Sequence, residues 1–158
     1  MLVVPGATGC VLPESLDVVS DVEVNYRPVV VEADPSTEKT VTMPVGAARE
    51  FSLKIEDLNI GDGLFVRFFV DFDAAHPTPA IQEEDWPAPV NPPPGDFVRS
   101  LTPEMFQCGV ALFPPPQSGM HVLSAFVSDR RYINDGSSVR RLPADAKTSE
   151  IAWLVVCP

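Results

Sequence analysis

The stretch FSLKIEDLNIGDGLFVRFFVDFD, residues Phe51 to Asp73, decides the fold class of this chain. Apolar side chains fill alternate positions before and after a glycine-containing acidic turn: Phe51, Leu53 and Ile55, then Leu64, Val66, Phe68, Val70 and Phe72. Successive side chains of a β-strand point to opposite faces, so a period of two indicates a strand with one buried face. The stretch therefore predicts two β-strands that form a hairpin-like pair at the core of the domain.

Other segments show related patterns along the whole chain. Strands are predicted at Val22–Tyr26, Val29–Val31, Val41–Val45, Phe106–Leu112, Met120–Arg130 and Ser149–Cys157. Met120–Arg130 is apolar on both faces, which is typical of a strand in the middle of a sheet. The only helical prediction is a single turn at Leu101–Met105, where Thr102 is a suitable cap and Pro103 suits the first helical position.

The overall composition narrows the class of protein. The chain has 158 residues, enough for one domain with a real core, and 45% of them are hydrophobic. Eleven basic against 22 acidic residues give a net charge of −11, which argues against binding to nucleic acid or to anionic membrane through a basic patch. Eighteen prolines predict long irregular connections. No apolar run is long enough to span a membrane as a helix.

The order of the predicted strands resembles that of bacterial immunoglobulin-like domains. In this resemblance Phe51 begins strand B, Leu64–Asp73 is strand C, Met120–Asp129 is strand F and Ser149–Val156 is strand G. The resemblance is architectural and covers residues 22 to 157. It implies an all-β fold, an immunoglobulin-like β-sandwich of about seven strands with long proline-rich loops, over residues 22–158.

The N-terminal residues MLVVPGATGC resemble the lipobox that ends a bacterial lipoprotein signal peptide, with small residues before Cys10. Ala7 replaces the more usual leucine, and no basic region precedes the apolar residues. The resemblance implies that residues 1–9 are the remnant of a signal peptide, that Cys10 carries lipid, and that residues 10–21 tether the domain. Val11, where inner-membrane proteins of this type have aspartate, implies the outer membrane of the cell envelope.

The chain has three cysteines. In an exported protein an odd number leaves one cysteine without a disulfide partner in the same chain. If Cys10 carries lipid, Cys108 and Cys157 remain to form a disulfide, between neighbouring strands or across the sandwich. The alternative is a pair of buried free thiols, as in many cytosolic cores.

Residues 74–99 contain seven prolines and no sustained period. So long a connection is generally functional or mobile, and Pro92, Pro93 and Pro94 favour a polyproline conformation. Ile81 and Trp86 either pin this loop to the domain or, with the three prolines, contact a protein partner.

Catalytic signals are weak. The chain has two histidines and none of the standard nucleophile, nucleotide or zinc motifs. Asp71 and Asp73 are predicted to share a strand face as a carboxylate pair, which is the one feature that suggests a hydrolase.

The carboxylate and amide oxygens of the acidic turn and of the following strand end are candidate calcium ligands, because calcium takes six to eight oxygens at flexible spacing. These residues are Asp57, Asn59, Asp62, Asp71 and Asp73. The alternative is that Asp57 and Asn59 simply form the turn.

These observations predict a non-catalytic envelope lipoprotein that acts as a binding or assembly module. We expect a membrane contact through the lipid, a protein partner, no nucleic acid and no cofactor, with calcium kept as an alternative. The alternative is an accessory structural subunit of a large membrane or extracellular assembly, joined through exposed strand edges. A third interpretation is a hydrolase or a calcium-dependent binding module.

Overall fold

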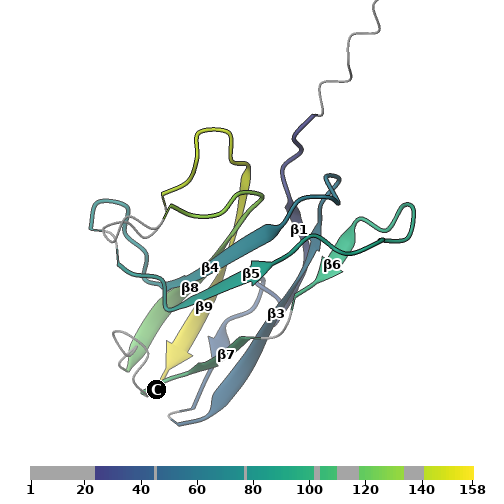
Figure 1. Cartoon of the computed structure of the whole chain (residues 1–158). Helices are drawn as coiled ribbons and strands as arrows, with labels where there is room; N and C mark the ends of the chain where they lie inside the picture. The colour runs from purple at the N-terminus through teal and green to yellow at the C-terminus, as the bar shows by residue number, and fades with distance from the viewer. Residues whose placement is uncertain (1–23, 45, 77, 102–103, 110–117, 134–140) are drawn as a thin grey trace, which may run out of the picture.

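The computed structural model describes residues 24–44, 46–76, 78–101, 104–109, 118–133 and 141–158. The regular elements among these residues are all β-strands, arranged in two sheets (Figure 1). The strands are β1 (Val29–Asp34), β2 (Val41–Thr42), β3 (Ala48–Glu56), β4 (Leu64–Val70), β5 (Gln82–Trp86), β6 (Val98–Ser100), β7 (Glu104–Gln107), β8 (Gly119–Ser128) and β9 (Thr148–Cys157). The described residues contain no helix long and apolar enough to cross a membrane.

The two sheets form a sandwich. One sheet has β3 in its middle, with β1 on one side and β6 and β7 on the other. The second sheet has the order β2-β9-β8-β4-β5, and β8 lies between β9 and β4 as its apolar sequence predicts. The predicted all-β, immunoglobulin-like β-sandwich is confirmed. Residues 1–9 and 10–21, the predicted signal remnant and tether, lie outside the described part of the chain.

The prediction of a hairpin-like pair at Phe51–Asp73 is wrong. β3 bonds with β1, β6 and β7 in one sheet, whereas β4 bonds with β5 and β8 in the other. The acidic turn therefore crosses from sheet to sheet, as the assignment of the two segments to strands B and C implies. The second strand is also shorter than predicted, because it ends at Val70.

The interior between the sheets contains the apolar side chains that the alternation of β3 and β9 predicts. Phe51 on β3 packs against Trp153 on β9 with ring centroids 5.2 Å apart. Phe106, on β7, is 5.3 Å from Phe51 and 5.2 Å from Phe68 on β4. These edge and tilted contacts join the two sheets and each contribute about 0.5–1.5 kcal/mol beyond burial.

A second apolar cluster lies on the outer face of β4 and β8, which the alternation assigns to solvent. It contains Phe69, Phe126 and Tyr132, all buried, and Arg67 stacks over the Tyr132 ring at 4.2 Å. Tyr132 also donates a hydrogen bond to the Phe126 carbonyl (2.9 Å). The segment after β8 therefore folds back over this face, which explains why both faces of β4 are buried.

Three further predictions of secondary structure need correction. Val24 and Tyr26 are exposed and lie outside any strand, because β1 begins at Val29. The supposedly irregular residues 74–99 contain β5 and the start of β6. Within Leu101–Met105, Glu104 and Met105 belong to β7 rather than to a helical turn. The predicted strand positions Val110 and Leu112 lie outside the described residues.

Candidate functional site

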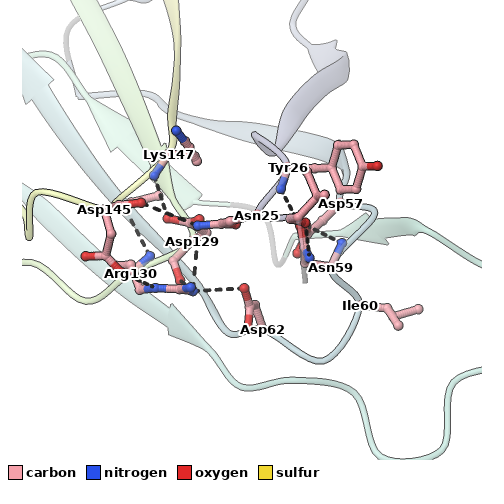
Figure 2. Close-up of polar contacts among 12 residues, drawn as sticks. Asn25, Tyr26, Asp57, Asn59, Ile60, Asp62, Asp129, Arg130, Asp145 and Lys147 are labelled. Atoms are coloured by element: carbon pink, nitrogen blue, oxygen red, sulfur yellow. Dashed lines mark hydrogen bonds and ion pairs between the residues drawn. The ribbon is translucent and has the colours of Figure 1, made fainter. Parts of the chain in front are cut away.

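The acidic turn between β3 and β4 lies in a cluster of polar contacts (Figure 2). Asp57 is fully buried and accepts a hydrogen bond from Arg99 Nη2 at 2.9 Å. Its other oxygen accepts the Asn59 backbone N–H at 3.0 Å, and Arg99 also donates to the Ile60 carbonyl at 3.1 Å. Burial raises the pKa of Asp57, against the lowering effect of the Asn59 backbone hydrogen bond and of Arg99. The ion pair between Asp57 and Arg99 holds the β3–β4 turn against β6.

Asn59 holds the segment that enters β1. Its side-chain oxygen accepts the Tyr26 backbone N–H at 2.6 Å, and its amide donates to the Val24 carbonyl at 3.0 Å. Figure 2 shows Asn25 and Tyr26 beside the turn. Both hydrogen-bonding groups of this side chain are therefore used to anchor the entering chain.

Asp62 binds the connection between β8 and β9. Arg130 Nη1 donates to it at 2.8 Å, and Arg130 Nε donates to Asp145 at 3.3 Å. Next to Arg130, the buried Asp129 accepts the Lys147 backbone N–H at 2.7 Å. The hydrogen bond with Asp62 is the main cause of the raised pKa of Arg130. This network joins the β3–β4 turn to both ends of the β8–β9 connection, at one end of the sandwich.

Asp71 and Asp73 lie beyond the other end of β4, and each has its own histidine. Asp71, at a φ of 49°, contacts His121 Nδ1 at 2.7 Å and accepts the Val122 backbone N–H at 2.8 Å. Asp73 contacts His76 Nδ1 at 3.0 Å, and that hydrogen bond lowers the pKa of Asp73. They do not share a strand face, because β4 has ended at Val70.

The five predicted calcium ligands are thus divided into two groups by the length of β4. Its seven residues extend over about 23 Å at the usual rise of a strand. Among the described residues, no group of three or more His, Cys, Asp or Glu side chains is arranged to hold a metal ion. Calcium binding is not tested by these contacts and stays a prediction. The five residues Asp57, Asn59, Asp62, Asp71 and Asp73 do not form a single ligand set, because they lie at the two ends of β4.

The predicted disulfide between Cys108 and Cys157 is confirmed, with the two Cα atoms 5.7 Å apart. Cys108 follows β7 and Cys157 ends β9, so the bridge joins the two sheets rather than neighbouring strands. Cys10 lies outside the described residues.

The predicted partner contacts in the proline-rich loop separate into buried and exposed residues. Ile81 and Trp86 are half-buried against the main core, and the Ile81 N–H donates to the Phe68 carbonyl at 2.8 Å. They pin the loop to the domain. Pro92 is half-buried as well, while Pro93 and Pro94 are exposed.

The sequence interpretation missed a groove between the edges of the two sheets. It has a volume of about 480 Å³ and lies between the start of β1 and the start of β9. Its lining consists of Arg27, Val29, Val30, Thr148, Ser149, Glu150 and Ile151. On its outer edge, β9 pairs with β2 only at Val155 and Val156. The sequence carries no signal for this groove, because its walls are more than 100 residues apart.

Comparisons with known proteins identify no family. No family model matches the chain, and no curated protein matches it. A similar solved structure is the CARDB domain of a protein from Pyrococcus furiosus, in complex with di-metal ions. The identity is 16%, over 74% of this chain and 86% of that one, with a TM-score of 0.35. The fold assignment given above rests on the two sheets themselves.

Proposed function

We propose that this chain is a non-catalytic binding and assembly module of the cell envelope, anchored by lipid on Cys10. The observation that carries the proposal is the Cys108–Cys157 disulfide. Disulfides persist in the oxidising compartments outside the cytosol and are rare inside it. Of three cysteines, this bridge leaves Cys10 alone, in the lipobox-like sequence. Val11 after it favours the outer membrane.

The contacts of the acidic side chains support a non-catalytic role. Asp57 and Asp62 each bind an arginine that belongs to another segment of the sandwich. Asp71 and Asp73 each bind a separate histidine. A hydrolase that uses the Asp71 carboxylate would lose activity in Asp71→Asn, and we rank this function last.

The groove between β1 and β9 supports an assembly role. β1 exposes Val29 and Val31, whose side chains are 46% and 50% accessible. The first half of β1, Val29–Val31, is apolar and its acidic residues Glu32 and Asp34 come after it, whereas the edge strand β5 carries Glu83, Glu84 and Asp85 in succession, and charge on an edge discourages strand addition. We propose that an extended segment of a protein partner binds along β1, with apolar side chains against Val29, Val30 and Ile151 and polar ones against the remaining lining of the groove, Arg27, Thr148, Ser149 and Glu150. The same contact would serve an accessory subunit of a larger assembly.

Lipid attachment is tested on protein purified from the membranes of the native organism. We expect an intact mass that begins at Cys10 and includes a diacylglyceryl group, and release into the soluble fraction for Cys10→Ser. A mass that begins at Met1 without the adduct would remove the lipid from the proposal.

The partner contact is tested by co-purification from the same membranes. Val29→Glu places a charge on β1 at the groove and is expected to release the partner. Val90→Glu is the control, because Val90 is 89% exposed on the proline-rich loop. If only Val90→Glu releases the partner, the contact lies on the loop. A monomer in gel filtration that retains a small molecule would favour a ligand-binding module instead.

A further inference from the structure

The outer edge of β9 is only partly covered by β2. The two strands are parallel and pair at Val155 and Val156, and the Met43 N–H, just after β2, donates to the Val156 carbonyl at 2.9 Å. Among the described residues, no strand pairs with this edge between Thr148 and Leu154. The start of the uncovered part of β9 forms one wall of the groove beside β1.

The directions of the β9 backbone groups follow from the hydrogen bond of Met43. The N–H and C=O of one strand residue point to the same edge of the strand, and those of the next residue point to the opposite edge. The Val156 carbonyl points to the β2 side, so the backbone groups of Ala152 and Glu150 point to that side as well. Those of Ile151 point to β8. A strand added at the groove would therefore leave the β8–β9 ladder intact.

The side chains beside this edge determine which residues an added strand can carry. Ile151 pairs with the buried Ala125 and is half-buried against the main core. Glu150 pairs with Phe126 of the outer cluster, so its exposed side chain lies on the outer face of the sheet. An apolar residue opposite Ile151 would extend the core, and a basic residue opposite Glu150 would face an acidic one.

β2 shows how this edge accepts a strand. Val41 of β2 lies opposite Val155, and its side chain is 3% exposed in the main core. β2 thus supplies β9 with main-chain hydrogen bonds and the interior with an apolar side chain. Trp153 marks the boundary of the region that the chain itself covers, because its indole N–H donates to the Pro35 carbonyl at 2.6 Å. Thr148–Ala152 therefore remains for a strand from another molecule.

We propose that the partner's extended segment adds to β9 as an antiparallel strand over Thr148–Ala152, with an apolar residue opposite Ile151 and a basic residue opposite Glu150. The inference rests on the proposed function, because it specifies how the partner in the groove is bound. We expect the antiparallel direction, since it is slightly more stable per residue than the parallel one.

A second copy of this chain is a poorer occupant of the same edge. The net charge of −11 opposes the association of two copies. Antiparallel pairing of two open edges about their middle residue would also place Glu150 opposite Glu150, and like charges directly opposite each other are destabilising. The acidic chain therefore favours a partner segment that is basic.

The test uses the capped peptide Thr-Val-Lys-Ser-Thr, whose valine lies opposite Ile151 and whose lysine lies opposite Glu150 in this register. The peptide is titrated to millimolar concentration into the full chain with Cys10→Ser, labelled with nitrogen-15 for NMR. We expect the amide signals of Ala152 and Ile151 to shift, while those of β5 do not. A peptide with N-methyl-lysine lacks the N–H that donates to the Glu150 carbonyl and should bind at least about tenfold more weakly.

A variant of this chain tests the same main-chain bonds from the other side. Ala152→Pro removes a donor on the open edge and none that bonds β8, and proline is accepted in edge strands at such positions. We expect it to weaken peptide binding at least about tenfold. Ala152→Thr is the control, because it keeps the N–H at an exposed position and should bind as the parent does. If Ala152→Pro does not fold, the methylated peptide decides the question.

Equal binding of the methylated and unmethylated peptides would overturn strand addition, and so would the absence of shifts on β9. Equal binding of a peptide with glutamate in place of lysine would contradict the basic residue opposite Glu150. Shifts on β9 that depend on protein concentration without peptide would identify a second copy as the occupant instead.

The native partner separates this inference from the proposed function. If Val29→Glu releases the partner from native membranes and Ala152→Pro retains it, the groove binds the partner but strand addition to β9 is wrong. If neither variant releases the partner, the proposed contact at the groove fails as well. Release by both variants, with retention by Ala152→Thr, supports both.

Discussion

Removal of the Cys108–Cys157 bridge is expected to cost this domain a large part of its stability. The bridge joins residues 49 positions apart, and the chain-entropy relation assigns a loop of that size about 4 kcal/mol at 25 °C. Both sulfurs are buried, so their replacement by alanine also removes packing contacts. For a domain of this length, 1 kcal/mol shifts the melting temperature by about 2–4 °C. The double alanine variant should therefore melt about 10–15 °C below its parent.

The measurement is thermal unfolding by circular dichroism, with both proteins in a Cys10→Ser background. That background removes the third cysteine, which would otherwise form intermolecular bridges in the oxidised parent. Thiol titration of the denatured parent should find no free cysteine. A melting temperature within about 3 °C of the parent's, or two free thiols in the parent, would refute the reasoning and with it the main support for export.

Two further predictions concern the acidic side chains. Asp57→Ala leaves Arg99 without its carboxylate in a nearly buried site, and we expect the free energy of unfolding, measured in urea, to fall by about 3 kcal/mol. The control is Asp96→Ala, because Asp96 is exposed in the neighbouring loop. It should lower the free energy of unfolding by less than about 0.5 kcal/mol. Millimolar calcium is expected to leave the melting temperature unchanged, because Asp57 and Asp62 are bound to arginines and Asp71 lies at the far end of β4. A rise of several degrees would show that calcium displaces these partners.

The strands that sequence predicted well are those with one face in the core. In β3 and β9, the side chains at Phe51, Leu53, Trp153 and Val155 are buried and their neighbours in sequence are more exposed. Alternation reports burial of one face directly, so a local pattern was sufficient for these strands. The same pattern did not show which strands pair, because pairing depends on contacts between distant segments.

β4 and β5 have features that a local sequence pattern did not predict. Phe69 and Arg67 are buried because Tyr132, more than 60 residues later, packs on the outer face of β4. Alternation within β4 contains no information about that segment. β5, with the sequence QEEDW, consists mostly of residues with low strand propensity, and its pairing with β4 outweighs that propensity.

The sequence predicted which acidic residues form the candidate site, but not which side chains bind them. The acidic turn was recognised as a polar cluster, yet the residues that bind it, Arg99 and Arg130, are 42 positions from Asp57 and 68 from Asp62. A sequence shows how much negative charge a turn contains, whereas only the fold shows which cations face it.

The structure changes where a function should be sought on this molecule. An acidic turn next to a core strand suggests a ligand site, but Asp57, Asn59 and Asp62 are each occupied by a contact that ties connections together at one end. A partner that competed for these groups would have to break several hydrogen bonds, of which the part-buried ones to the two carboxylates are each worth about 1.5–3 kcal/mol. The β1 edge requires no such exchange, since Val29, which lines the groove, is already exposed. This difference supports the proposal that a partner binds along the β1 edge rather than at the acidic turn.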